Sequence, residues 1–122
     1  MCFRGVSEIQ KMFRAFPDIP LRGYLIWQPV LQSDDDISAA RRTRQFTDQR
    51  LTHFWDGNRL TGKLWQPVLE DKRIPWDVYL LYHANARWEE APTAPDFWLH
   101  RLNRPNIERF ELKMKQMLDQ MW

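Results

Sequence analysis

Cysteine, glycine and long apolar runs are scarce in this sequence. Its 122 residues include one cysteine and four glycines. A single cysteine excludes an internal disulfide and a zinc site built from cysteines of this chain. The few glycines lack the spacing of a phosphate-binding loop, and we expect no bound cofactor.

Long apolar segments are missing as well. No stretch approaches the roughly 18 apolar residues of a membrane-spanning helix. Arg4, Glu8 and Lys11 interrupt the first apolar positions, which is unlike the apolar core of a secretion signal. The sequence therefore predicts a cytoplasmic protein with no membrane partner.

The charge is close to balanced, with a formal net charge of +2. A nucleic-acid-binding domain concentrates basic residues more strongly, so we expect no nucleic-acid partner. Arg41, Arg42, Arg44 and Arg50 could contact phosphate, but we interpret them as a solvated helix face.

The three histidines do not form a motif. His53, His83 and His100 fall on separate predicted elements, whereas a metal site needs its ligands to converge and carboxylates to complete the shell. We interpret them as surface or capping residues and predict no metal site.

Aromatic residues, by contrast, are abundant. Aromatic residues make up 14% of the chain and include seven tryptophans, within 43% apolar residues overall. This composition is typical of one packed globular domain. Helical and strand patterns alternate along the chain, which predicts an α/β fold.

The central feature is a near-continuous apolar run, 76–82, which follows Pro75 and predicts a buried strand. Earlier residues predict a helix over 4–16, ended by Pro17, and a buried strand over 21–27. The remaining predicted elements are a helix over 37–46, a strand over 51–55, a helix over 59–69, a turn and brief edge strand ending at 87–88, a helix from Asp96 through Leu102, and a last helix over 106–122.

The last predicted helix carries a wide apolar stripe. The stripe consists of Ile107, Phe110, Met114, Met117, Leu118 and Met121. A stripe of this width is costly to leave in water. We expect it to pack on the domain or to pair with a second copy in a homodimer, since methionine adapts to irregular surfaces.

Three local patterns resemble the thioredoxin-like family, in the branch that holds peroxiredoxins and the bacterial cytochrome-maturation thiol oxidoreductases. Cys2-Phe3-Arg4-Gly5 before an amphipathic helix resembles the second cysteine of a Cys-x-x-Cys motif. Phe54-Trp55-Asp56-Gly57 through Leu64 resembles the inserted strand and helix of that branch. Ile74-Pro75 before a strand resembles the family's cis-proline, which faces the active-site cysteines.

This resemblance implies an α/β, thioredoxin-like fold with a central mixed sheet flanked by helices over residues 1–104. Residues 105–122 would form an added C-terminal helix. The strands over 21–27 and 76–82 would be adjacent in one sheet, with the helix over 5–16 on one face. A cis peptide bond would join Ile74 and Pro75.

The implied activity is thiol–disulfide exchange with a protein thiol partner. Cys2 would be the redox residue, at a helix N-terminus where the helix dipole and the positive charge of Arg4 favour a thiolate. Pro75 would be its structural neighbour. Two alternatives remain: Cys2 is a terminal cysteine without a role, or the chain is a non-catalytic thioredoxin-like domain that binds or dimerises.

The sequence departs from the family pattern at its start. The family's central strand and its first motif cysteine have no counterpart before Cys2. We therefore predict a shortened version of a longer redox protein. A selenocysteine at the first motif position, encoded by a stop codon, would explain the start; a misassigned start and a chain that truly begins here are the alternatives.

Overall fold

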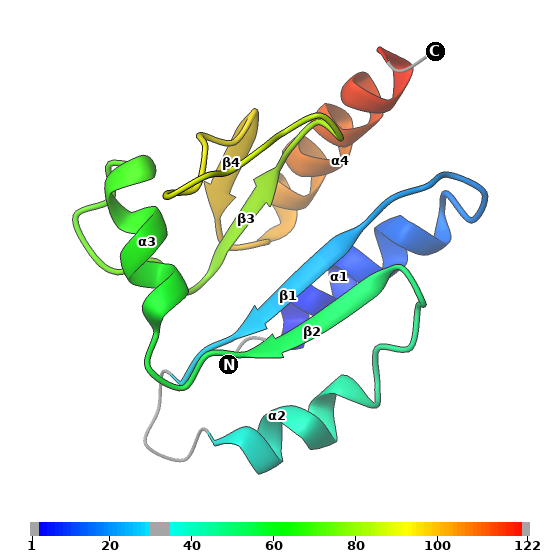
Figure 1. The fold of residues 1–122 in the computed structure, drawn as a ribbon. Helices are drawn as coiled ribbons and strands as arrows, with labels where there is room; N and C mark the ends of the chain where they lie inside the picture. Colours follow the sequence, from blue (N-terminus) through cyan, green and yellow to red (C-terminus); the bar gives the residue numbers. More distant parts are fainter. Residues whose placement is uncertain (1–2, 30–34, 121–122) are drawn as a thin grey trace. The chain divides into compact units, whose positions relative to one another are not determined.

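The computed structural model describes residues 3–29 and 35–120 of the chain. They fall into two units, Met1–Thr61 and Gly62–Trp122, each described here by itself. The elements, shown in Figure 1, are α1 (Phe3–Arg14), β1 (Gly23–Trp27), α2 (Asp36–Thr43), β2 (Leu51–Trp55), α3 (Leu60–Val68), β3 (Val78–Leu81), β4 (Phe97–His100) and α4 (Arg104–Asp119). The chain is mixed α/β, as predicted, and no helix in the described ranges has the length and apolar character needed to cross a membrane.

In the first unit, β1 and β2 form a parallel pair. The register runs from Gly23 opposite Leu51 to Trp27 opposite Trp55. Side chains alternate between the two faces of a strand, so one face carries Leu25, Trp27 and Leu51. Residues of α1, α2 and the segment after α2 complete a core on that face, namely Val6, Phe13, Ala39 and Phe46.

Gly23 allows the close approach of α1 to the sheet. A Cβ atom at this position would lie 2.6 Å from Leu51 Cδ2 and 3.1 Å from Phe13 Cζ. A side chain here would displace the ends of the Leu51 and Phe13 side chains, so the start of β1 favours glycine.

Arg50, the residue before β2, caps the C-terminal end of α1. Its Nη1 donates to the carbonyl oxygens of Phe16 and Ile19 at 2.6 and 3.0 Å, and its Nη2 donates to that of Phe13 at 2.7 Å. Asp48 fixes the guanidinium through Nε at 3.1 Å and Nη2 at 2.9 Å. Carbonyl groups at a helix end lack partners within the helix, and Arg50 satisfies them from a distant segment. The interpretation of Arg50 as part of a solvated face is therefore wrong.

The second unit contains an antiparallel pair covered on one face by α4. Tyr79 of β3 lies opposite Leu99 of β4. The ring of Phe110 in α4 lies 6.4 Å from that of Tyr79 and 6.3 Å from that of Phe97. Figure 1 shows α4 running alongside this pair.

Most of the C-terminal stripe is buried as predicted. Phe110, Met114, Met117 and Leu118 are at most 7% exposed. Ile107 is half-buried, and Met121 lies outside the described residues. The helix starts at Arg104, earlier than predicted, because Asn103 caps it and Pro105 fits its first turn. A domain over 1–104 followed by a separate helix stays a prediction.

The helix predicted from Asp96 through Leu102 is wrong, because Phe97–His100 forms β4. The alternation of Phe97 and Leu99 with Trp98 and His100 has the period of a strand, and β3 supplies the partner. The brief strand predicted at 87–88 is also absent from this described segment; a long connection joins β3 to β4 instead.

The predicted pairing of the two apolar strands stays a prediction, because β1 and β3 belong to different units. Within the units, β1 pairs with β2 and β3 pairs with β4. No described peptide bond is cis, so the expected cis bond between Ile74 and Pro75 is also wrong. The apolar runs were correctly identified as strands, but apolar character does not encode which strand is the neighbour.

Replacing Arg50 with alanine should lower the free energy of unfolding by about 3 kcal/mol, because the carbonyl oxygens of α1 lose a charged donor and Asp48 loses its partner. Urea unfolding followed by circular dichroism measures this. Arg41→Ala removes an exposed arginine of α2 and should change little. Equal effects of the two substitutions would contradict the role of Arg50.

The pair should also set part of the acid stability. The hydrogen bonds from Arg50 lower the pKa of Asp48 from 3.8 to about 2. The unfolded chain therefore binds the proton first, so the contribution of Asp48 is present above about pH 4 and is lost as the pH falls toward about 2. Asp48→Asn should be less stable at neutral pH and should lose less stability over this acid range. Parallel pH profiles for the two proteins would contradict this.

Candidate functional site

Of the predicted site around Cys2, the structure describes the first turn of α1. Cys2 lies outside the described residues and directly precedes α1 in the sequence. The first turn holds no acidic residue, and Arg4 within it is exposed. Free backbone N–H groups and the helix dipole make such a turn favourable for negative charge.

Two features fix the position of α1: its packing in the core and the contacts of Arg50 at its C-terminal end. Val6 and Phe13 belong to the core, and Arg50 stacks over the Phe13 ring at 5.0 Å while it caps the helix. Gln10 is buried, and its Oε1 lies 3.5 Å from the backbone nitrogen of Asp48, which donates to it. These contacts hold α1 in place against the core. A reactive group at the start of the helix would need such positioning.

The residues predicted for the site do not form one cluster within either unit. Arg4 belongs to the first unit and Pro75 to the second. Pro75 is buried, and its peptide bond is not cis. The predicted roles of Cys2, Arg4 and Pro75 stay predictions.

His53 is half-buried, and both of its ring nitrogens contact residues of the core. Its Nδ1 accepts a hydrogen bond from Trp27 Nε1 at 3.1 Å, and its Nε2 lies 3.2 Å from the carbonyl oxygen of Phe46. The neutral ring with its proton on Nε2 satisfies both contacts. With both nitrogens engaged, His53 has none left for a metal.

The other two histidines each meet an aspartate. His83 Nδ1 lies 2.9 Å from Asp96 Oδ1, and the backbone N–H of His83 donates to Asp96 Oδ2 at 2.9 Å. These contacts, the backbone one first, lower the pKa of Asp96. His100 Nε2 lies 3.1 Å from Asp71 Oδ2, without hydrogen-bond alignment.

Neither histidine–aspartate pair grows into a metal site. Across 3–29 and 35–120, no three histidine, cysteine, aspartate or glutamate residues gather as metal ligands would. The sequence offered no signal for either pair, because the partners are far apart in the chain and share no motif. The contact between His83 Nδ1 and Asp96 Oδ1 orients the His83 ring.

An aromatic cluster stabilises the connection between β3 and β4. Trp65 Nε1 donates to the Tyr82 hydroxyl at 3.1 Å, and that hydroxyl donates to the carbonyl oxygen of Thr93 at 2.7 Å. The Trp88 ring meets that of Trp65 edge-on at 4.9 Å. Burial raises the pKa of Tyr82. Since the Trp65 indole and the Tyr82 hydroxyl are both engaged within the cluster, these groups serve the fold.

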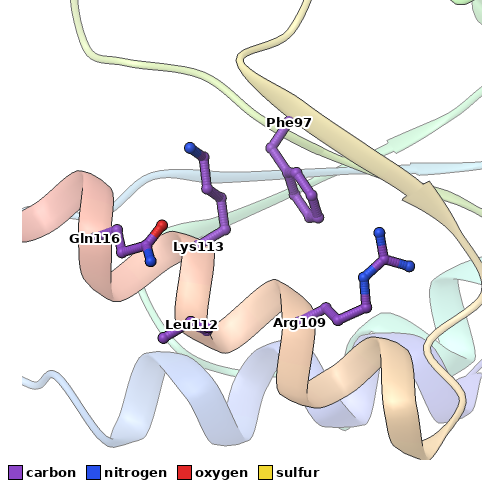
Figure 2. A pocket seen from close by; sticks show the side chains of 5 residues that line it. All are labelled: Phe97, Arg109, Leu112, Lys113 and Gln116. Atoms are coloured by element: carbon purple, nitrogen blue, oxygen red, sulfur yellow. The ribbon is translucent and has the colours of Figure 1, made fainter.

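A hollow of about 210 Å³ lies between α4 and the start of β4. Figure 2 shows the Phe97 ring directed toward α4, with the Arg109 and Lys113 side chains on either side of it. Leu112 and Gln116 complete the lining. The two cations would attract an anionic group, but the hollow has no buried polar side chain to select one.

Comparison with known proteins gives no relative. No protein-family model matches the chain, and neither a curated protein nor a solved structure shows significant similarity.

Replacing His53 with phenylalanine should lower the free energy of unfolding by about 1–3 kcal/mol, because the buried Trp27 indole N–H loses its acceptor while the ring volume is kept. Urea unfolding followed by tryptophan fluorescence tests this. Tyr24→Phe is the control, since it removes a hydroxyl from an exposed ring of the same sheet. A stability equal to that of the control would contradict the role of His53.

Proposed function

We propose that this chain is a thioredoxin-like domain related to thiol–disulfide oxidoreductases, in which Cys2 is the reacting thiol. The observation that carries the proposal is the helix that begins directly after Cys2, with Arg4 and no acidic side chain in its first turn. A thiolate at that place is favoured over the thiol. Cys2 is the sole cysteine of this sequence, so it is the thiol to which the proposal refers.

The order of elements agrees with the family pattern in part. The thioredoxin-like resemblance implies an inserted strand and helix from Phe54 to Leu64 and a hairpin that follows the strand over 76–82. The structure has β2 and α3 around the inserted segment, and β3 pairs with β4 in antiparallel fashion. This order supports the proposal. The second strand of the antiparallel pair lies at Phe97–His100 rather than at 87–88, and the bond before Pro75 is trans; both are departures from the expected pattern.

The reaction that a single cysteine allows is an exchange with a disulfide of another molecule. The Cys2 thiolate attacks one sulfur of that disulfide, a mixed disulfide forms, and the second sulfur leaves as a thiolate. A second thiol, from the same partner or from a small molecule, then attacks the mixed disulfide and restores Cys2. This chain supplies only the Cys2 sulfur. The two sulfurs of the attacked disulfide belong to the partner, and the thiol that releases Cys2 comes from the partner or from a small molecule.

The pH dependence of alkylation tests this proposal. The rate at which iodoacetamide modifies Cys2 should reach half its maximum at a lower pH than for free glutathione under the same conditions. Oxidised glutathione should form a mixed disulfide with the protein, visible by mass spectrometry, and Cys2→Ser should abolish both signals. A half-point equal to that of glutathione, with no mixed disulfide, would overturn the proposal.

A matched pair of charge reversals tests the role of Arg4. Arg4→Glu should slow alkylation near pH 7 about two- to fivefold, because a helix-end charge contributes about 0.3–1 kcal/mol. Arg14→Glu makes the same change at the opposite end of α1 and should leave the rate unchanged. Circular dichroism checks that both variants keep their helices. Equal rates for the two variants would show that Arg4 does not act on Cys2.

A second candidate is a non-catalytic thioredoxin-like domain that binds another protein. The observation in its favour is the exposed sheet face of the first unit, where Tyr24 and Phe54 stack with ring centroids 6.5 Å apart and are 65% and 50% exposed. Binding through this face would survive Cys2→Ser, whereas thiol exchange would not, so that variant separates the two candidates.

A further inference from the structure

The contacts of His53 fit only a neutral imidazole ring. Its Nδ1 accepts from Trp27 Nε1 at 3.1 Å, and its Nε2 lies 3.2 Å from the carbonyl oxygen of Phe46. An indole N–H only donates a hydrogen bond, and a carbonyl oxygen only accepts one. The ring therefore carries its proton on Nε2 and none on Nδ1.

Protonation reverses one of these two contacts. The second proton goes to Nδ1, because Nε2 already holds one, and an imidazolium ring has two donors and no acceptor. Two N–H groups would then face each other where Trp27 Nε1 and His53 Nδ1 are 3.1 Å apart. The bond from Nε2 to the carbonyl oxygen of Phe46 gains from the charge. A single proton thus breaks the bond to Trp27 and spares the other.

Trp27 connects this contact to the core of the first unit. Its side chain is 4% exposed, and it belongs to one buried cluster with Val6 of α1 and Ala39 of α2. Its ring stacks on that of Phe46 at 6.3 Å and lies nearly parallel to that of His53 at 6.1 Å. All these residues belong to the first unit. Release of the Trp27 indole therefore loosens the packing between the sheet and its helices within that unit.

The charged groups of the first unit give a protonated His53 no compensating ion pair. Asp48 is paired with Arg50, and Asp56 accepts from the N–H groups at the start of α3. No ion pair of the described residues includes His53. The other titratable groups on or beside the elements around it are Arg4, Glu8, Lys11 and Arg14 of α1, Tyr24 of β1, Asp35 and Asp36 at the start of α2, and Arg41, Arg42 and Arg44 at its end. Arginine is the commonest of these, so the surrounding charge does not favour another cation.

We propose that His53 is an acid-sensitive switch built into the first unit, which binds the Trp27 indole when neutral and releases it when protonated. Histidine ordinarily titrates near pH 6.5. The unfolded chain takes up the proton without losing a bond, so it binds more protons than the folded chain, and stability falls as the pH decreases from about 7.5 to about 5. This range lies above the acid range assigned to Asp48. The proposal does not depend on the thiol chemistry of Cys2.

Nuclear magnetic resonance of the intact protein follows both atoms of the contact. The ring nitrogens of His53 should show the Nε2–H tautomer at pH 7.5. As the pH is lowered to 5, the indole N–H signal of Trp27 should shift with the same midpoint as the protonation of the His53 ring. An Nδ1–H tautomer at pH 7.5, or a Trp27 signal that stays constant or does not follow the His53 ring, would overturn the proposal.

A variant that cannot titrate tests the consequence for stability. In His53→Asn the amide oxygen takes the place of Nδ1 as an acceptor for Trp27 and keeps it at every pH. Between pH 7.5 and pH 5 the unfolding equilibrium constant, measured with urea, should rise about tenfold more for the natural protein than for this variant. His100→Asn is the control, because that ring meets Asp71 in the second unit, and it should not reduce the change. Equal changes for the natural protein and His53→Asn would contradict the proposal.

Discussion

Arg50 organises the first unit, because it joins two segments that are far apart in the sequence: the stretch from Phe13 to Gly23 and the residues just before β2. It donates to the carbonyl oxygens of Phe13, Phe16 and Ile19, it is oriented by Asp48, and its own carbonyl oxygen accepts the first bond from β1. The end of α1 and the start of the β1–β2 pair are thus fixed at one point. The contacts of Arg50 at the C-terminal end of α1 therefore also help to position its N-terminal turn, where Arg4 lies.

Each sheet has only two strands, which is marginal for a sheet without further support. The first gains its stability from the core built by Val6, Phe13 and Ala39 on one face, and the second from Phe110 against Tyr79 and Phe97. Helices can cover a face but cannot satisfy the backbone groups of an edge.

The chemistry available to the chain is narrow because its polar groups are largely used in the fold. His53 is engaged by Trp27 and Phe46, His83 and His100 meet aspartates, and Tyr82 bridges Trp65 and Thr93. The first turn of α1 holds no acidic residue. The proposed roles of Cys2 and Arg4 rest on the sequence, because a helix start is a local pattern. The histidine partners could not be found from the sequence, since each lies on another segment.

The sequence by itself determined most of the elements, because the spacing of apolar residues is a local property. Val6, Ile9 and Phe13 predicted α1, the run around Tyr79 predicted β3, and the stripe of Phe110, Met114 and Met117 predicted the buried face of α4. Only the tertiary structure decided how they pair. Apolar strands resemble one another, so nothing local distinguishes β2 from β3 as the neighbour of β1. Phe97–His100 is a strand because it pairs with β3. Arg50 caps a helix because the fold brings carbonyl groups that are 31 to 37 residues away within hydrogen-bond distance of it.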